Sequence, residues 1–77
     1  MDQSQYIELE VINTNTILLR IIMIIKKRRI NIKSFFAEIN HADSETARFK
    51  MVLEVDAEKI RLLKTQFEKV LDVVSVN

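Results

Sequence analysis

Two different spacings of apolar side chains alternate along the chain, and this change of period constrains the fold more than any other feature. In residues 6–11, Ile7, Leu9 and Val11 alternate with polar side chains, which is typical of a half-buried β-strand. Residues 46–55 alternate in the same way, with charged side chains on the opposite face. The apolar face of this second segment consists of Phe49, Met51, Leu53 and Val55.

Two other segments have the period of an α-helix. The first begins at Ile17 and ends in the basic run Lys26–Arg29, which complements the negative end of a helix dipole. The second follows Asp56, which is predicted to cap it, and ends near Asp72. The predicted apolar faces are Leu18, Ile21, Ile22 and Ile25 in the first helix and Ile60, Leu63, Phe67 and Val70 in the second.

Residues 30–40 and 73–76 supply two further strands, so the predicted order is β-α-β-β-α-β. This order is the ferredoxin-like pattern of the α+β class, in which two helices cover one face of a four-stranded antiparallel sheet. We expect a bulge near Ser34, and Phe35 and Phe36 on opposite faces of their strand. The outer sheet face, expected to be wet or to meet a partner, carries Tyr6, Glu8, Glu10, Arg48, Lys50 and Glu54.

The chain contains no glycine and no proline, so other residues must form every turn. The run Asn13–Thr16 joins the first strand to the first helix, and Thr14 or Thr16 can cap that helix. Residues 40–45 are polar and predict a hairpin loop. The run Asn13–Thr16 is therefore either a simple polar turn or a loop that holds a ligand.

Composition excludes several classes of protein. A net charge of +1 argues against general polyanion binding, and the absence of cysteine excludes disulfides and thiolate chemistry. We expect a single domain over residues 1–77, with its core in residues 6–76 and no signal peptide. The most apolar run is too short to span a membrane, so a cytoplasmic location is predicted. A domain of this size has a small core, which favours association with another chain.

No catalytic or metal-binding constellation is evident in the sequence. His41 is the only histidine, and Glu8 and Glu10 lie on one strand face with no cleft implied. We interpret Met23 and Met51 as core residues. The sequence therefore predicts a protein that is not an enzyme and has neither a metal nor a cofactor of its own.

Several motifs resemble an ACT domain, and in particular the N-terminal ACT domain of acetolactate (acetohydroxyacid) synthase regulatory small subunits. Asn13 matches the asparagine of the loop between the first strand and the first helix in that family. The segment Asn31–Ser34 matches an Asn-Ile-x-Ser motif after the basic helix end. The closing segment of the family is matched by Gln66, Lys69, Leu71, Asp72 and Val73. The resemblance covers residues 7–76.

The resemblance also shows two departures, because Thr16 and Arg29 stand where the family has glycine. Many of these subunits bind valine between two ACT domains, and a side chain at residue 16 would keep a ligand from the backbone N–H groups. The chain also ends at Asn77, without the C-terminal domain of most such subunits, as short members of the family do. Asn31 either fixes the chain reversal or offers its amide to a ligand. The effector-binding residues that the resemblance implies are Asn13, Thr14, Asn15, Thr16, Ile17 and Asn31.

Two functions follow from the resemblance. The first is a homodimeric regulatory subunit that binds and activates the thiamine-diphosphate-dependent catalytic subunit in branched-chain amino-acid biosynthesis, with weak or no valine feedback. The contact surface for that subunit is expected on the outer sheet face or the basic helix end. The alternative is a stand-alone dimeric sensor of a branched-chain amino acid. RNA binding is disfavoured because Glu8, Glu10 and Glu54 on the outer face would repel phosphates.

Overall fold

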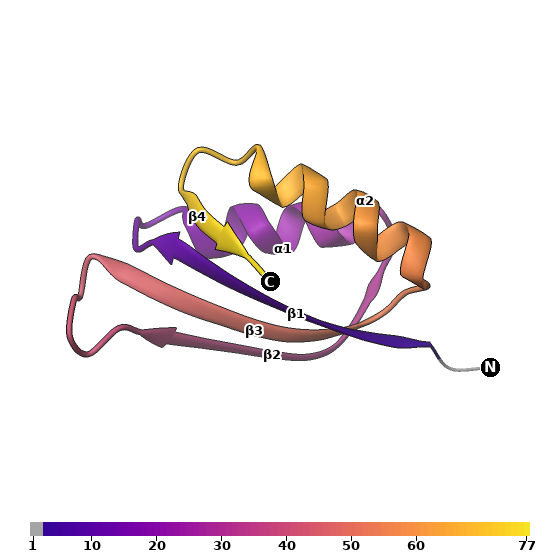
Figure 1. Ribbon diagram of the computed structural model, residues 1–77, viewed down its shortest axis with the longest axis horizontal. Helices are drawn as coiled ribbons and strands as arrows, with labels where there is room; N and C mark the ends of the chain where they lie inside the picture. Colours follow the sequence, from indigo (N-terminus) through magenta and orange to yellow (C-terminus); the bar gives the residue numbers. More distant parts are fainter. Residues whose placement is uncertain (1–2) are drawn as a thin grey trace.

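The computed structural model describes residues 3–77 and has the predicted order of elements (Figure 1). Two helices lie on one face of a four-stranded antiparallel sheet, which confirms the ferredoxin-like prediction. No helix within these residues combines the length and apolar character needed to cross a bilayer. The elements are β1 (Ser4–Ile12), α1 (Ile17–Lys27), β2 (Asn31–Ile39), β3 (Thr46–Glu54), α2 (Ala57–Glu68) and β4 (Val73–Val76).

The strands lie in the order β2-β3-β1-β4, so β2 and β4 form the two edges. Strand β2 has nine residues, whereas β4 has only four. The pairing of β2 with β3 shifts register between Ile32 and Ser34, which confirms the predicted bulge. Helix α1 lies against β2, and α2 lies against β4. The hairpin of β2 and β3 extends past the end of the helix layer (Figure 1).

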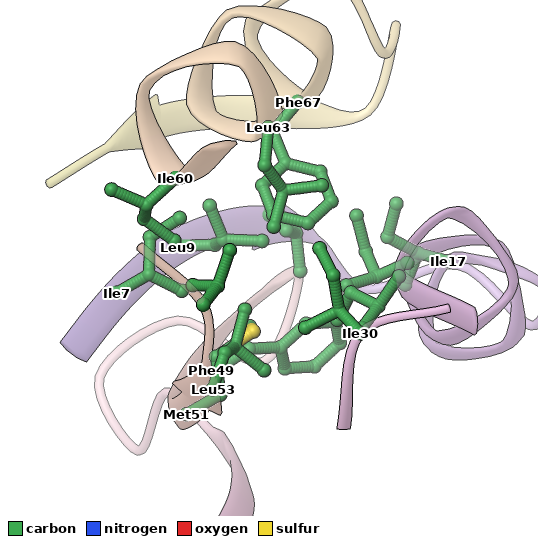
Figure 2. Close-up of a cluster of buried hydrophobic side chains, with 14 of the residues drawn as sticks. Ile7, Leu9, Ile17, Ile30, Phe49, Met51, Leu53, Ile60, Leu63 and Phe67 are labelled. Atoms are coloured by element: carbon green, nitrogen blue, oxygen red, sulfur yellow. The ribbon is translucent and has the colours of Figure 1, made fainter. Parts of the chain in front are cut away.

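The core lies between the sheet and the two helices, and it contains only apolar side chains among the described residues (Figure 2). The inward faces of β1 and β3 are buried as their alternation predicted. The rings of Phe35 and Phe49 pack with their centroids 5.5 Å apart, while Phe36 lies on the other face and is 55% exposed. The largest fully buried side chains are Phe67, Ile7, Leu9, Ile17, Ile21, Ile25, Met51, Leu53, Leu63 and Val11.

The predicted inner face of α1 was wrong in part. The structure buries Ile17, Ile21 and Ile25, whereas Leu18 is 42% exposed and Ile22 is half-buried. Almost every residue from 17 to 25 is apolar, so the predicted stripe and the buried stripe both have helical spacing. The period alone therefore does not show which stripe faces the core. The same rotation leaves Met23 60% exposed, so its interpretation as a core residue was also wrong.

Helix α2 follows its prediction closely. The Asp56 side chain accepts a hydrogen bond of 2.8 Å from the Lys59 backbone N–H, which confirms the predicted cap. The stripe of Ile60, Leu63 and Phe67 is buried against the sheet. The helix ends at Glu68, a turn before the predicted end at Asp72, and Val70 is half-buried against the core from the following turn.

Polar side chains form the turns, as the absence of glycine requires. In the hairpin loop, Asn40 Oδ1 accepts the Ala42 N–H and Asp43 Oδ1 accepts the Glu45 N–H, each at 3.0 Å. These bonds let short polar side chains hold the backbone in a turn. Within residues 3–77 a positive φ occurs at Arg29 alone, where φ is 60°. This is the position at which the resembled family has glycine, and the structure gives the reason: the chain reverses there through the left-handed region.

Replacing Arg29 with glycine is expected to stabilise the domain by about 0.5–1 kcal/mol, because the left-handed strain of ~1–2 kcal/mol exceeds the entropy cost of a new glycine. Thermal unfolding followed by circular dichroism measures the effect. Lys27→Gly is the matched control: it places a glycine in the last turn of α1 and is expected to destabilise the domain by about 1 kcal/mol. A lower melting temperature for Arg29→Gly would contradict the assignment of strain at this residue.

Candidate functional site

Backbone contacts to the β2–β3 hairpin loop hold the loop between β1 and α1 in place. The Asn13 N–H donates to the Glu45 carbonyl at 2.8 Å, and its side-chain Nδ2 donates to the Ser44 carbonyl at 3.3 Å. The Thr14 N–H donates to the Ile12 carbonyl at 2.9 Å. The amide group of Asn13 therefore has a structural role, while its Oδ1 atom accepts no hydrogen bond from the described residues.

A small polar cluster lies beside this loop. The Thr14 hydroxyl is 3.5 Å from Asp72 Oδ2, and Arg20 Nη1 lies 4.0 Å from the same oxygen. The Asp72 carbonyl also accepts the Ile12 N–H at 2.7 Å, which fixes this aspartate against the end of β1. Asp72 and Arg20 were not among the predicted site residues. One signal for Arg20 was present in the sequence, because it is the single charged residue in the apolar run of α1.

The N-terminus of α1 has no side-chain cap. Thr16 occupies the N-cap position, but its side chain makes no capping hydrogen bond, and the first turn contains no acidic residue. The predicted threonine cap was therefore wrong, because Thr14 interacts with Asp72 and Thr16 has a backbone conformation (φ −108°, ψ −8°) in the helical region, not the extended region of a capping residue. The first N–H groups of α1 thus remain available for an external acceptor such as a carboxylate.

The remaining predicted loop residues contribute in different ways. Ile17 is fully buried in the core, so this predicted site residue offers no accessible surface to a ligand within one chain. Asn15 is exposed and makes no hydrogen bond to the described residues through its side chain. The backbone of Thr16 lies in a region open to any residue, so a glycine at this position would differ mainly by the space it leaves.

Asn31 lies far from this loop within one chain. It begins β2 directly after the C-terminal end of α1, and its Nδ2 donates to Glu54 Oε1 at 3.1 Å. The 11 residues of α1 separate the two positions by about 16 Å along the helix. A single chain therefore does not bring Asn31 together with residues 13–17.

The outer face of the sheet carries charged pairs and two exposed aromatic rings. Arg48 Nε lies 3.3 Å from Glu8 Oε2, and the Tyr6 hydroxyl donates to Glu8 Oε1 at 2.9 Å. This hydrogen bond to a carboxylate raises the pKa of the Tyr6 phenol. Tyr6 and Phe36 are more than half exposed on this face, and His41 is exposed in the hairpin loop. No group of His, Cys, Asp or Glu within residues 3–77 is arranged to hold a metal ion.

The fold is that of a small ferredoxin-like α+β domain, and the comparison with known families identifies its class. A family profile described as "ACT domain" matches residues 13–76. The chain belongs to the ACT domain family, whose members are regulatory domains. A search of curated protein sequences found no match.

Solved structures with the same fold come from several different proteins. The chain superposes on the acetolactate synthase small subunit of Thermotoga maritima with a TM-score of 0.86 and 19% identity. It superposes on the ACT domain of the GTP pyrophosphokinase of Chlorobium tepidum with a TM-score of 0.82 and 22% identity, covering 100% of this chain and 97% of that one. For the formyltetrahydrofolate deformylase of Burkholderia mallei the TM-score is 0.69, the identity is 9%, and 86% of this chain and 23% of that chain are covered.

These similarities define the fold, not the role. The match to the small subunit covers 97% of this chain but 46% of the small subunit, so this chain spans less than half the length of that protein. These solved structures share 22% identity or less with this chain and come from proteins with different activities, so they show the fold alone. The particular function must therefore be argued from the residues.

Proposed function

We propose that this ACT domain is the regulatory small subunit of an acetolactate synthase. It binds and activates the thiamine-diphosphate-dependent catalytic subunit of branched-chain amino-acid biosynthesis, with weak or no response to valine. The observation that carries the proposal is the set of three motif matches, at Asn13, Asn31–Ser34 and Gln66–Val73, on the fold of the Thermotoga maritima small subunit. The chemistry belongs to the catalytic subunit, and this chain acts through contact alone.

The exposed apolar surface supports association with another chain. On α1, Leu18 and Ile22 are one helical turn apart on the flank beside the buried stripe; Leu18 is exposed and Ile22 is half-buried. The same side of the molecule carries β2, a nine-residue edge strand with an exposed phenylalanine at Phe36. An unpaired edge of this length and an apolar helix flank beside it favour a homodimer in which β2 pairs with its copy.

Such a dimer also completes the proposed effector site. A two-fold axis that runs β2 antiparallel to its copy reverses the direction of α1, so the start of one α1 lies near the end of the other. The loop Asn13–Ile17 of one protomer then faces Asn31 of the partner subunit. The uncapped N-terminus of α1 provides N–H groups for a carboxylate, and Asp72 provides a negative charge for an ammonium group. An amino acid is the ligand class that this arrangement suits.

Reconstitution tests the proposed function. The purified chain is titrated into the catalytic subunit from the same organism, and acetolactate formation is measured. A saturable rise in rate is expected. The ACT domain of a GTP pyrophosphokinase, which has the same fold, is the matched control and should leave the rate unchanged. An unchanged rate at saturating concentrations of the chain itself would refute activation.

Replacing Thr16 with glycine is expected to lower the Kd for valine at least about tenfold, because the β-branched side chain no longer keeps the ligand from the N–H groups of α1. Isothermal titration calorimetry measures the affinity. Asn15→Gly is the control, since it adds the same loop flexibility without making room at the helix end. Equal gains in the two variants would refute the steric explanation. Tight valine binding by the unmodified chain, with no effect on the catalytic subunit, would favour the stand-alone sensor.

A further inference from the structure

An apolar groove lies along α1 on the surface opposite the sheet and is bounded on one side by Gln66 of α2. It has a volume of about 880 Å³, and its floor includes Leu19, Met23 and Ile24 of α1. Leu19 is 61% exposed, and Met23 is nearly as open to solvent. Gln66 of α2 lines the other wall, where its Oε1 accepts a 2.7 Å hydrogen bond from Arg28 Nε. Large apolar side chains so exposed at the centre of a groove are typical of a binding surface.

The rim of the groove is positively charged. Arg20, Lys26 and Lys27 line it, and no acidic residue does. Lys27 has no ion-pair partner among residues 3–77, while Lys26 Nζ reaches only the Ile30 carbonyl at 3.4 Å. Arg20 lies at the limit of an ion pair with Asp72, at 4.0 Å, and half of its side chain is exposed. The groove therefore combines an apolar floor with a basic rim, on which Lys26 and Lys27 have no carboxylate partner among residues 3–77.

The groove lies on a different side of α1 from the flank proposed for the homodimer. Thr16, Arg20 and Lys27 recur at helical spacing on the side that faces Gln66 of α2. Leu18 and Ile22 lie on the opposite flank and do not line the groove. A homodimer formed through that flank and β2 leaves the groove open on each protomer.

We propose that this groove is the docking site for an acidic amphipathic helix of the catalytic subunit. The proposal rests on the proposed function and names the contact surface for that partner. An apolar stripe on the docking helix covers Leu19 and Met23, and its flanking carboxylates pair with Lys26 and Lys27. Charge complementarity selects an acidic segment and speeds its association. An anionic membrane matches the charge as well, but the groove is bounded on one side by Gln66 of α2, which suits a rod-shaped segment more than a flat surface.

The test compares variants of the full chain for binding to the catalytic subunit by biolayer interferometry. The double variant Leu19→Glu/Met23→Glu is expected to weaken binding at least about thirtyfold, because it removes two central apolar contacts and repels the acidic segment. Lys26→Glu/Lys27→Glu is expected to weaken binding about tenfold or more and to reduce its dependence on salt. All four positions are exposed, and far-ultraviolet circular dichroism checks that the fold is retained.

Matched controls lie outside the groove, where Leu71→Glu in the turn after α2 and Arg61→Glu on the exposed side of α2 make the same kinds of change. Both controls should bind within about twofold of the unmodified chain. If the unmodified chain binds and the groove variants bind equally well, the groove proposal is overturned while the proposed function stands. If the unmodified chain does not bind the catalytic subunit at all, the groove proposal and the proposed function both fail. A last outcome concerns membranes. If the unmodified chain binds phosphatidylglycerol vesicles, and the groove variants lose this binding but still bind the catalytic subunit normally, the proposal is also overturned.

Discussion

Phe67→Ala is expected to leave most of the protein unfolded at 25 °C. The ring is fully buried at the centre of the core (Figure 2), and truncations of this kind cost about 3–5 kcal/mol through lost burial and the cavity left behind. A core of this size gives a free energy of unfolding of only about 3–5 kcal/mol, so a single truncation removes nearly all of it. Urea titration followed by far-ultraviolet circular dichroism measures the loss as a fall in the midpoint.

The control for this substitution is Leu71→Ala. Leu71 is 91% exposed, and surface changes of this kind usually alter the free energy of unfolding by about 0.5 kcal/mol or less. If the protein is a dimer, the midpoint of Phe67→Ala should also rise with protein concentration, because association stabilises only the folded chain. A Phe67→Ala variant with the midpoint of the unmodified chain would contradict the packing of α2 described here.

The double variant Leu18→Glu/Ile22→Glu is expected to convert the proposed homodimer into monomers. Central apolar residues of an interface contribute about 2 kcal/mol each, so losing two of them raises the dissociation constant by roughly a thousandfold. Leu18 is exposed and Ile22 half-buried within one chain, so the change acts mainly on the dimer. Sedimentation velocity at micromolar concentrations separates the two states.

Leu62→Glu is the control for the dimer, because it makes the same kind of change on α2, away from the proposed dimer flank, and should leave the sedimentation coefficient unchanged. If dimerisation and the effector site depend on each other, the monomeric variant should also lose valine binding in a Thr16→Gly background. A monomeric unmodified chain at these concentrations would refute the dimer and, with it, the two-chain effector site.

The sequence predicted the fold well where apolar and polar side chains contrast sharply. Strand β3 alternates between buried and charged residues, and its inner face was identified correctly. Helix α1 contains too many isoleucines and leucines for its period to fix its rotation, so Leu18 and Met23 were assigned to the core. The rotation is set by packing against the sheet, and that information is not local to the helix.

Less of the candidate site than of the fold could be predicted from the sequence. The loop Asn13–Thr16 was identified through its resemblance to a family, since its composition alone indicates only a turn. Asp72 approaches Thr14 across a sequence separation of 58 residues, and only the pairing of β1 with β4 brings them together. The groove beside Met23 depends on the position of Gln66 in another helix, and no spacing within α1 indicates it.

The unequal lengths of the two edge strands limit how far copies of this chain can polymerise. The edge strand β2 has nine residues and can pair with a second copy. The other edge strand, β4, has four residues and an irregular pairing with β1, so it offers too few backbone groups to pair with a third copy. We therefore expect growth through the sheet to close after the single two-fold pairing of the proposed homodimer and not to continue into a fibre. This chain, which has no glycine or proline to interrupt its strands, is thus expected to resist further association through the sheet because β4 is short.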